Sequence, residues 1–465
     1  MTHIKKVIII GAGPAGLAAA YELSRHGIKV EIYEASAHVG GMARSIKLFG
    51  QTVDCGPHRF FTKNRLVSGF FYEILGNDFV EVKRLTRIYY SGRYFDYPLK
   101  PGNVFKKLRL YRVIRIMFSY LWGKLSLNKD IHTLEAWVIQ KFGSELYQIF
   151  FKNYSEKLWG IPCSRIDADW AAQRIKSLSL WEAGKRILAI NQKDKHHSLI
   201  EKFDYPKYGS GMLYERARKE IERNEGKVHL NCPVQSLLVE NGEVKGIRLV
   251  NGSEVEADHV ISTMPLTTLV KTLPNLPVAV QQAADQLYFR NTILVYLEVD
   301  SNHLFDDNWL YIHSPAVRHG RVTNFRNWSP HLYGDKKTSI LCMEFWAFEQ
   351  DDLWQAEDTI LKRLAEKEIR QIDLLGPETG ILNAEVLRIP RCYPVYEVGY
   401  RQHIDIISSY LRKFSNLQLI GRYGSFKYNN QDHSILMGLL AAKKLLGDDW
   451  INLWEVNSDQ EYQEE

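Results

Sequence analysis

The sequence predicts an α/β protein that folds into two or three lobes. With 465 residues, the chain is too long for a single hydrophobic core. Its balance of 45% hydrophobic and 25% charged residues is that of a folded globular protein. Near the N-terminus, a β-branched run is followed at once by closely spaced glycines and then by helical spacing. This pattern is typical of a strand, a tight turn and a helix in an α/β sheet.

Composition and charge restrict the partners that the chain can bind. The net charge of +6 suits anionic small molecules and gives no strong reason to expect nucleic acid. The five cysteines are scattered, without a Cys-x-x-Cys pair or a histidine at metal-ligand spacing, so we expect a reduced, cytoplasmic protein without a bound metal. Residues 7–20 are apolar after two lysines, but glycines interrupt this run and charged residues follow it, which argues against a signal peptide. No apolar stretch reaches the roughly 18 residues of a membrane-spanning helix.

The first predicted unit is a βαβ arrangement of the Rossmann-like kind. Residues 6–10 predict a buried parallel strand, residues 17–26 a helix and residues 29–33 a second strand. Glu34 stands at the end of the second strand, where a carboxylate can accept hydrogen bonds from both ribose hydroxyls of a dinucleotide.

Three glycines between the first strand and the helix each have a separate role. Gly11 allows the tight turn, Gly13 lets a pyrophosphate approach the main chain, and Gly16 lets the helix pack closely on the strand. The phosphates would lie at the helix N-terminus, beside Ala15.

A second glycine motif indicates which dinucleotide is bound. Residues 39–45 resemble the second glycine motif of FAD-binding oxidoreductases of the amine oxidase superfamily; the residues expected to contact the cofactor are Gly40, Gly41, Met42 and Arg44. Residues 226–234 are similar to the strand whose last residue, here Val234, meets the adenine. The resemblance implies non-covalently bound FAD in a Rossmann-like domain of the GR2 type.

The same resemblance implies a discontinuous domain organisation. Residues 257–263 are similar to the strand that closes the FAD-binding domain. We therefore expect an FAD-binding domain formed by residues 1–90, 200–270 and 415–448. An inserted, mixed α+β substrate-binding domain would comprise residues 271–414, a helical subdomain residues 91–199, and a C-terminal tail residues 449–465.

Five further segments resemble one branch of this superfamily, the UDP-galactopyranose mutases. They are residues 56–62, 95–99, 153–160, 391–395 and 421–432. The resemblance implies a catalytic role beside the flavin for His58 and cofactor contacts for Gly421, Arg422, Asp432 and Ser434. It implies catalytic and substrate-binding roles for Arg326, Tyr393 and Tyr428, and substrate contacts for Arg174 and Asn430.

Each of these roles has a chemical reason and an alternative. A helix that begins near Asp432 would direct its positive end at the flavin pyrimidine edge. His58 would tune the flavin, or it could be a hydrogen-bonded structural histidine. Arg326 has no acidic residue within the next eight positions, which favours an anionic partner such as a diphosphate, although an ion pair within the fold is equally consistent. Tyr393 and Tyr428 could donate to phosphate oxygens or to main-chain carbonyls.

The sequence also departs from the mutase pattern. Asn430 stands where the mutases carry an acid. Residues 203–212 replace the segment that holds uridine in the mutases, and they look more like the helix start of amine oxidases, phytoene desaturases and protoporphyrinogen oxidases. The flavin half of the site therefore matches the mutases better than the substrate half does.

Three functional hypotheses follow. The leading one is an FAD enzyme similar to the mutases, acting on a nucleotide- or diphosphate-linked sugar in cell-surface glycan biosynthesis, with N5 of reduced flavin as the nucleophile. The alternative is an oxidoreductase of the amine oxidase or protoporphyrinogen oxidase type that removes hydride from a C–N or C–C bond. The third is a flavin-bound subunit, without catalysis, of a membrane-associated glycan assembly.

One segment could bring the protein to the periphery of a membrane. Residues 104–125 predict a loosely amphipathic helix in which lysines and arginines alternate with large apolar side chains. Such a helix could be a core helix with a solvated basic stripe, or it could lie on acidic lipid and give access to a lipid-linked substrate.

Overall fold

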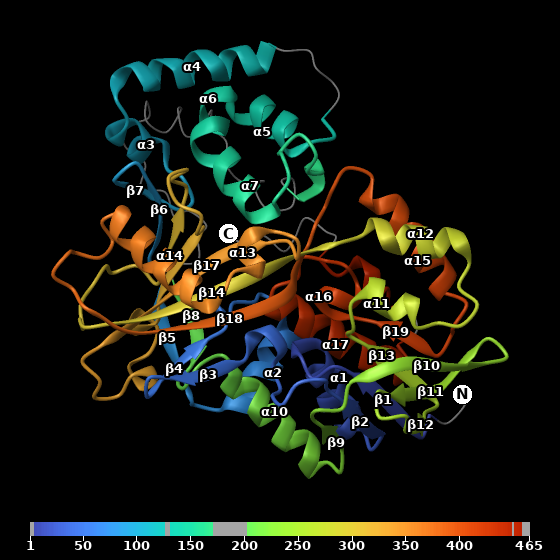
Figure 1. The fold of residues 1–465 in the computed structure, drawn as a ribbon. Helices are drawn as coiled ribbons and strands as arrows, with labels where there is room; N and C mark the ends of the chain where they lie inside the picture. The colour runs from blue at the N-terminus through green and yellow to red at the C-terminus, as the bar shows by residue number, and fades with distance from the viewer. Residues whose placement is uncertain (1–3, 126–130, 171–201, 449–450, 458–465) are drawn as a thin grey trace.

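One half of the protein is built on a five-stranded parallel sheet. A computed structural model describes residues 4–125, 131–170, 202–448 and 451–457. The strands of this sheet lie in the order β19 (Leu417–Leu419), β13 (His259–Ser262), β1 (Lys6–Ile10), β2 (Lys29–Tyr33) and β9 (Lys227–His229). All its pairings are parallel. The strands come from three distant parts of the chain that lie side by side at the lower right of Figure 1.

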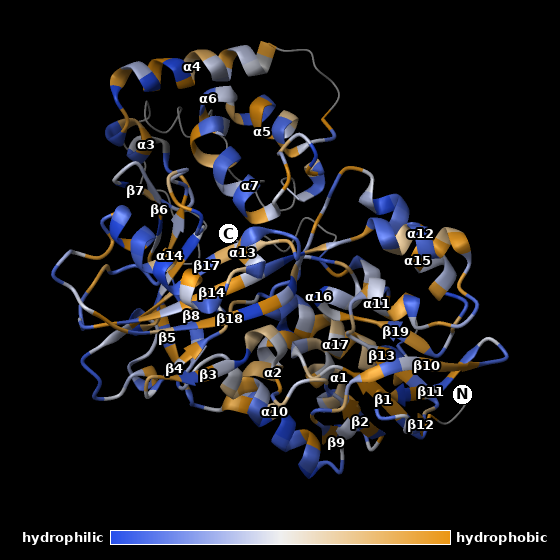
Figure 2. Cartoon of the chain, in the orientation of Figure 1, coloured by the Kyte–Doolittle hydropathy of each residue, from blue (hydrophilic) through white to orange (hydrophobic). Residues whose placement is uncertain are grey.

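Two helices pack on this sheet and on each other. They are α1 (Pro14–Arg25) and α17 (Gln431–Leu445). Both start earlier than predicted, since we expected the first helix to begin at residue 17 and the second near Asp432. Small side chains at the contact let the helices approach closely: a Cβ added to Gly438 of α17 would lie 2.2 Å from the carbonyl oxygen of Ala15. β1 contributes Val7 and Ile9, both fully buried, beneath them. The two ends of the chain are thus joined in one core (Figure 2).

Antiparallel hairpins and further helices complete this half. The three-stranded sheet β10 (Val234–Glu240), β11 (Glu243–Leu249) and β12 (Glu254–Glu256) turns at Asn241-Gly242 and at Asn251-Gly252, two pairs of the kind that favours tight hairpins. Asn241 and Gly242 have φ of 52° and 79°, as a type I′ turn requires. Other elements are β3 (Ser45–Leu48), β4 (Gln51–Asp54), β5 (Phe79–Lys83), β8 (Lys202–Pro206), α2 (Arg65–Leu75), α10 (Gly211–Arg223), α11 (Leu266–Lys271), α12 (Val278–Gln286), α15 (Tyr400–Leu411) and α16 (Gly421–Gly424).

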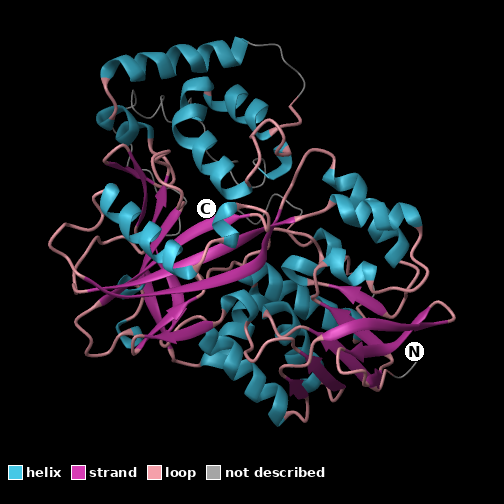
Figure 3. Ribbon diagram, viewed as in Figure 1, coloured by secondary structure: helices cyan, strands magenta, loops and turns pink. Residues whose placement is uncertain are grey.

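A mixed seven-stranded sheet forms the second half (Figure 3). Its order is β18 (Ile381–Pro394), β14 (Phe289–Val299), β17 (Ser339–Ala347), β16 (Arg321–Asn324), β15 (Trp309–Ile312), β6 (Thr86–Tyr90) and β7 (Arg93–Asp96). The helices α13 (Asp352–Gln355) and α14 (Asp358–Gln371) follow β17. Because β6 belongs to this sheet, the sheet begins before the domain boundary that we expected at residue 90.

A helical subdomain lies above the sheets in Figure 1. It contains α3 (Pro101–Lys107), α4 (Leu110–Leu125), α5 (Leu134–Phe142), α6 (Ser144–Leu146), a π-helical turn (Tyr147–Lys152) and α7 (Asn153–Trp159). The single helix predicted over residues 104–125 is wrong, because the chain breaks at Leu108, whose main chain is extended. The Arg93 guanidinium donates to the Lys107 carbonyl there, so this carbonyl is held outside the helix.

The predicted C-terminal tail is partly ordered against the core. Leu453 and Val456 are buried, and the Lys427 ammonium donates to the carbonyls of Trp454 and Val456. From Asn457 onward the sequence is polar and acidic with nothing to bury, which predicts a frayed end. Asn457 instead donates to the Tyr428 carbonyl at 3.2 Å and to the Asn429 side chain at 2.9 Å, and it lines the cavity described next.

Candidate active site

A cavity of about 610 Å³ runs between the two halves of the molecule. At one end it is lined by the glycine motifs of the five-stranded sheet, and at the other by side chains of the seven-stranded sheet and the helical subdomain. Most of the site residues expected from the sequence line this one cavity: Gly11, Gly13, Ala15, Glu34, Gly41, Met42, His58, Val234, Tyr393, Gly421, Arg422, Tyr428, Asn430, Asp432 and Ser434.

The turn after β1 has the shape that a bound pyrophosphate needs. Gly11 has φ of +97°, and a Cβ on Gly16 would lie 2.0 Å from the Gly11 carbonyl oxygen, so both positions require glycine. A Cβ on Gly13 would meet nothing within 4 Å, because this residue faces the cavity at the N-terminus of α1. The open space at Gly13 and the main-chain N–H groups of the helix start fit a dinucleotide phosphate.

Glu34 is held at the edge of β2 by main-chain donors. Its carboxylate accepts hydrogen bonds from the N–H groups of Ala12, at 2.7 Å, and Ser36, at 2.9 Å. It lines the cavity together with Val234, the first residue of β10. A carboxylate fixed in this way can accept from ribose hydroxyls, so the residues present fit FAD.

Gly16, Gly40 and Arg44 support this end from just outside the cavity lining. The Gly40 N–H donates to the Ala12 carbonyl at 2.8 Å, which joins the two glycine motifs. The Arg44 guanidinium donates to the Gly41 carbonyl at 3.0 Å. Their predicted contacts with the cofactor remain proposals.

The first turn of α17 forms another part of the cavity wall. The residues from Asn430 to Ser434 line the cavity. Asn430 caps the helix: its side chain accepts from the main chain of His433, and the His433 ring accepts from the Asn430 N–H. The positive end of a 15-residue helix is therefore directed into the cavity, and its placement at the flavin pyrimidine edge stays a prediction.

His58 is held on the turn that follows β4. Its Nε2 lies 3.2 Å from the Cys55 carbonyl, and Gln431 of α17 donates to the carbonyls of His58 and Arg59 at 3.2 and 2.8 Å. Burial, together with the smaller effect of the positive charges of Arg321 and Arg422, lowers the pKa of His58 to about 4. His58 is therefore a neutral imidazole at neutral pH.

Two stacked tyrosines and an arginine line another part of the cavity wall. The Tyr393 and Tyr428 rings are 5.4 Å apart and nearly parallel, and the guanidinium of Arg422 lies 4.8 and 4.4 Å from their centroids. Arg422 donates through Nε to the Cys392 carbonyl and through Nη1 to the Asn429 carbonyl, both at 2.8 Å. Its Nη2 is buried and has no hydrogen-bond partner within the described ranges, so one donor remains for a ligand.

Arg321 is a cavity residue that the sequence analysis did not identify. It lies on β16 directly opposite Glu344 on β17, and its guanidinium donates to both oxygens of that carboxylate at 2.5 Å. Burial opposes the charged form of Arg321, but Glu344 outweighs it and holds the pKa well above its usual value. The Arg321 Nη2 also lies 3.4 Å from the Tyr393 hydroxyl.

Arg326 does not line the cavity. Its guanidinium donates to the carbonyls of Lys336 and Thr338 at 3.0 and 2.9 Å and lies 3.9 Å from the ring centroid of Tyr333. Main-chain carbonyls thus satisfy the charge for which we expected a diphosphate, and the assignment of Arg326 to the substrate is corrected. Arg174 lies outside the described residues.

His313 and Tyr154 add a second group of side chains that the predicted site lacked. Their rings are stacked at 4.8 Å, and both line the cavity. Burial and then the nearby Lys157 lower the pKa of His313 to about 3. Lys157 fixes the loop after β15 by donating to the carbonyls of Ile312, Ser314 and His319.

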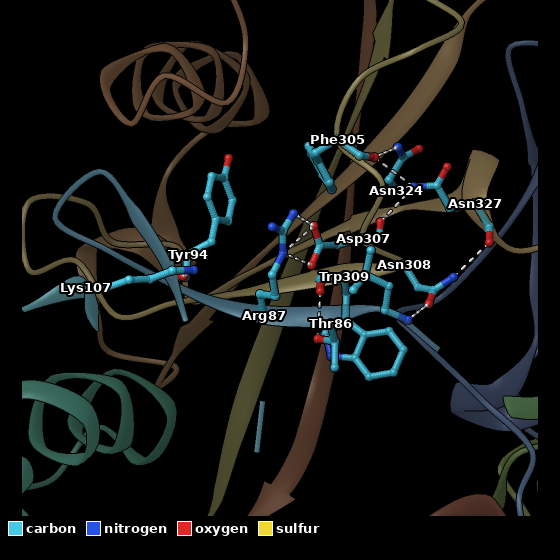
Figure 4. Close-up of polar contacts among 11 residues, drawn as sticks. Thr86, Arg87, Tyr94, Lys107, Phe305, Asp307, Asn308, Trp309, Asn324 and Asn327 are labelled. Carbon is cyan, nitrogen blue, oxygen red and sulfur yellow. Dashed lines mark hydrogen bonds and ion pairs between the residues drawn. The ribbon is translucent and has the colours of Figure 1, made fainter. Parts of the chain in front are cut away.

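A polar network fixes the part of the seven-stranded sheet from which Trp309 and Tyr311 line the cavity (Figure 4). Arg87 of β6 forms an ion pair with the buried Asp307 at 2.6 Å. Asn308 accepts from the Leu85 N–H and donates to the Asn327 carbonyl, both at 2.8 Å. These contacts join β6 to the chain before β15. Within the described ranges, no three His, Cys, Asp or Glu side chains lie close enough together to hold a metal ion.

Comparisons with known proteins agree with this architecture. The family described as flavin containing amine oxidoreductase matches residues 14–446. The chain is 26% identical over 359 residues to 4,4'-diapophytoene desaturase (4,4'-diapolycopene-forming) of Methylomonas sp, covering 70% of this chain and 66% of that protein. It is 24% identical over 333 residues to an L-amino-acid oxidase of Crotalus adamanteus, covering 65% of this chain and 59% of that protein. The matches thus span less than two thirds of either relative.

A solved structure extends the likeness to nearly the whole chain. The structure of reduced UDP-galactopyranose mutase has a TM-score of 0.86, with 24% sequence identity, and the match covers 97% of this chain and 99% of that chain. A likeness at this level of identity establishes the fold.

Proposed function

Because the chain belongs to the family of flavin-containing amine oxidoreductases, we propose that it is an FAD enzyme acting on a nucleotide- or diphosphate-linked sugar. The coarser part of this statement follows from the family: the protein is an FAD-dependent enzyme that binds its cofactor non-covalently and acts on a small molecule. The sugar, its diphosphate and a role in glycan synthesis are the proposal.

The convergence of one group of side chains carries the proposal. Arg321, Tyr393, Tyr428 and Arg422 come from three separate parts of the chain and line the cavity together with His58. Guanidinium groups and phenol hydroxyls are the donors that bind phosphate oxygens well. Their placement in the same cavity as the glycine motifs fits a second phosphate-bearing molecule beside the cofactor.

The charges in the free protein define what each arginine can contribute. Arg321 is already balanced by Glu344. Arg422 has no carboxylate within the described ranges that forms an ion pair with it, and its unused Nη2 is available to an anion. We infer that Arg422 supplies most of the charge for a diphosphate and that Arg321 orients it with the Tyr393 hydroxyl.

The remaining residues would position the substrate and exclude water. Bound FAD, when reduced, supplies a nucleophilic nitrogen. The aromatic rings of Tyr154, Trp309 and Tyr311 offer faces on which a sugar can stack. His58 stays neutral, so it can exchange hydrogen bonds with the flavin without adding charge.

The second candidate function is hydride removal from a C–N or C–C bond. Two observations favour it. The Glu344 carboxylate balances the charge of Arg321 at the cavity wall, and aromatic side chains such as Tyr154, Trp309 and Tyr311 line the same cavity, as an apolar or amine substrate would require. The two curated relatives described above are named as a desaturase and an oxidase.

A titration of the purified holoprotein separates the two functions. We expect UDP and UDP-galactopyranose to perturb the flavin absorbance, and a ring isomer of the sugar to form only after dithionite reduction. Bleaching of oxidised flavin by an amine or a polyene, without any response to the UDP ligands, would replace this function by the second one.

Paired variants test the residues. Arg321→Gln alone would leave Glu344 buried without its partner, so the informative variant is Arg321→Gln/Glu344→Gln. We expect it to weaken UDP by roughly 30- to 150-fold, as loss of a charge-assisted contact of about 2–3 kcal/mol predicts. Arg326→Gln is the matched control and should leave UDP binding unchanged. Equal loss in both variants would contradict the assignment of Arg321.

A further inference from the structure

The outer face of α4 carries a stripe of exposed apolar side chains. We call Leu110, Met117, Phe118, Leu121, Trp122 and Leu125 the α4 stripe; Phe118 and Trp122 are 70% and 77% exposed. With about 100° per residue, these positions cover about 140° of the helix surface. An apolar face of this width normally lies against another surface.

The opposite face of α4 is anchored, so the stripe cannot turn inward. Ile116 is buried in the core, and Gly123 lies so close to α5 that a Cβ would be 2.8 Å from the Ile139 carbonyl oxygen. Arg115, beside the stripe, forms an ion pair with Glu145 of α6 at 3.0 Å. The packing of α4 on the subdomain therefore fixes the stripe on the outside, at the top edge of the molecule in Figure 1.

The chain segment that carries the stripe has only positive charges. Residues 97–129 contain eight lysines and arginines and no aspartate or glutamate. Lys106 and Arg109 are exposed just before the stripe, and Arg112 and Arg115 lie beside it. Two copies of this face brought together would place these cations against each other, which opposes self-association.

We propose that the α4 stripe docks on the surface of a membrane that contains acidic lipid. The apolar side chains would enter the boundary between headgroups and acyl chains, and the flanking cations would contact the anionic headgroups. None of the helices within the described ranges is long and apolar enough to cross a bilayer, so the helix lies in the interface. Tyr97, Pro98 and Leu99, which line the cavity, lead directly into α3 and α4, so docking would also fix the cavity relative to the lipid.

Cosedimentation of the holoprotein with vesicles tests the docking. We expect binding to vesicles of phosphatidylcholine with phosphatidylglycerol, weaker binding to phosphatidylcholine alone, and weakening by salt. Phe118→Ser/Trp122→Ser should lower the affinity for the acidic vesicles by about ten-fold or more. Val278→Ser is the control for an exposed apolar residue elsewhere, since Val278 is 72% exposed on α12.

A second pair of variants tests the charge. Lys106→Gln/Arg109→Gln should reduce binding to the acidic vesicles, whereas Arg363→Gln/Lys367→Gln, which removes two exposed cations from α14, should not. Brominated phosphatidylcholine in the acidic vesicles should quench tryptophan fluorescence of the unmodified protein more than that of Trp122→Phe.

Two results would overturn the proposal. One is the absence of binding to acidic vesicles at low salt, or binding that the stripe variants do not change. The other is a concentration-dependent dimer that Phe118→Ser/Trp122→Ser abolishes, which would assign this face to a second copy of the chain. All these readouts are independent of catalysis, so they stand or fall separately from the proposed function.

Discussion

The two ends of the cavity are built from different parts of the polypeptide. The nucleotide end uses main-chain groups and glycines within short stretches, such as Gly11, Gly13 and the first turn of α17. The substrate end uses long side chains, and its central pair, Arg321 and Glu344, comes from two neighbouring strands. The first end depends on local backbone shape, whereas the second depends on which strands become neighbours.

This difference explains the electrostatics of the two ends. Main-chain N–H groups at a helix start carry partial charges that no side chain needs to balance. At the substrate end the protein itself supplies Glu344 to balance the buried guanidinium of Arg321. The nucleotide end is therefore ready for an anion, whereas at the substrate end Arg422 has an unused donor and Arg321 is already balanced.

The largest expected effect is at the nucleotide end. Gly13→Val should lower FAD affinity by about 1000-fold and give a colourless protein, because the side chain would fill the space that faces the phosphate. The circular dichroism of the apoprotein should be unchanged, since a Cβ at Gly13 meets no protein atom within 4 Å.

Gly69→Val on α2 is the control, because its added Cβ would meet only the end of the Glu73 side chain. It should retain FAD. A Gly13→Val protein that purifies with stoichiometric FAD would show that the pyrophosphate binds elsewhere.

The next largest effect is expected at Asp54, which connects the two halves of the molecule. Asp54 is fully buried; it accepts from Tyr205 and Ser210, and its carbonyl accepts from Tyr296 of the seven-stranded sheet. Burial raises the pKa of its carboxyl to about 7. The folded protein then holds a proton that the unfolded chain releases near pH 4, so the contribution of Asp54 to stability falls as the pH rises from about 4 to about 7, by about 2–4 kcal/mol.

Asp54→Asn should remove this fall, measured as the dependence of Tm on pH in the holoprotein. Asp352→Asn is the control: its pKa is lowered by Arg318, so its titration lies below this window and the variant should keep the wild-type slope. An unchanged slope in Asp54→Asn would show that Asp54 is ionised in the folded protein at pH 4–7.

The difference between the nucleotide end and the substrate end also explains which site residues the sequence could predict. The βαβ unit and the cavity residues Gly11, Gly13 and Glu34 were predicted because each follows from a few adjacent residues, and His58 was predicted from the resemblance to the mutases. Arg326 was chosen because its sequence neighbours contain no acid, but the carbonyls that satisfy it come from Lys336 and Thr338. Distance along the chain carries no information about such contacts.

A usable signal for Arg321 did exist. Arg321 and Glu344 each stand in a short, otherwise largely buried strand, and one opposite charge in each of two such strands predicts a cross-strand pair. The break between α3 and α4 had no comparable signal, because the contact of Arg93 with the Lys107 carbonyl depends on how β7 is placed.

A smaller effect is expected from removing the carboxylate that balances Arg321 at the substrate end. Glu344→Gln removes the carboxylate that balances Arg321, so an anionic ligand should gain the guanidinium. We expect UDP to bind about 10-fold more tightly, a gain of about 1.4 kcal/mol, while Tm falls. Glu298→Gln, on the buried β14 of the same sheet, is the control. Weaker UDP binding in Glu344→Gln would mean that Arg321 does not contact the diphosphate.

The smallest effect concerns His58 and compares the two ends directly. His58 and His313 are both cavity histidines whose pKa is lowered by burial, to about 4 and about 3, so both are neutral at pH 7. His58 is linked to the start of α17 through Gln431, whereas His313 stacks on Tyr154 at the substrate end.

With one nitrogen of His58 beside the Cys55 carbonyl, the other can accept from the N–H that only reduced flavin carries. His58→Ala should therefore retain FAD and lower the two-electron reduction potential by about 30 mV, equivalent to about 1.4 kcal/mol. His313→Ala should leave the potential unchanged. Because a neutral imidazole does not titrate between pH 5 and 8, the His58→Ala shift should be constant across that range in a spectroelectrochemical titration. A shift that changes near pH 6.5 would mean that His58 is protonated beside the flavin, and equal shifts in both variants would mean that neither histidine acts on the flavin specifically.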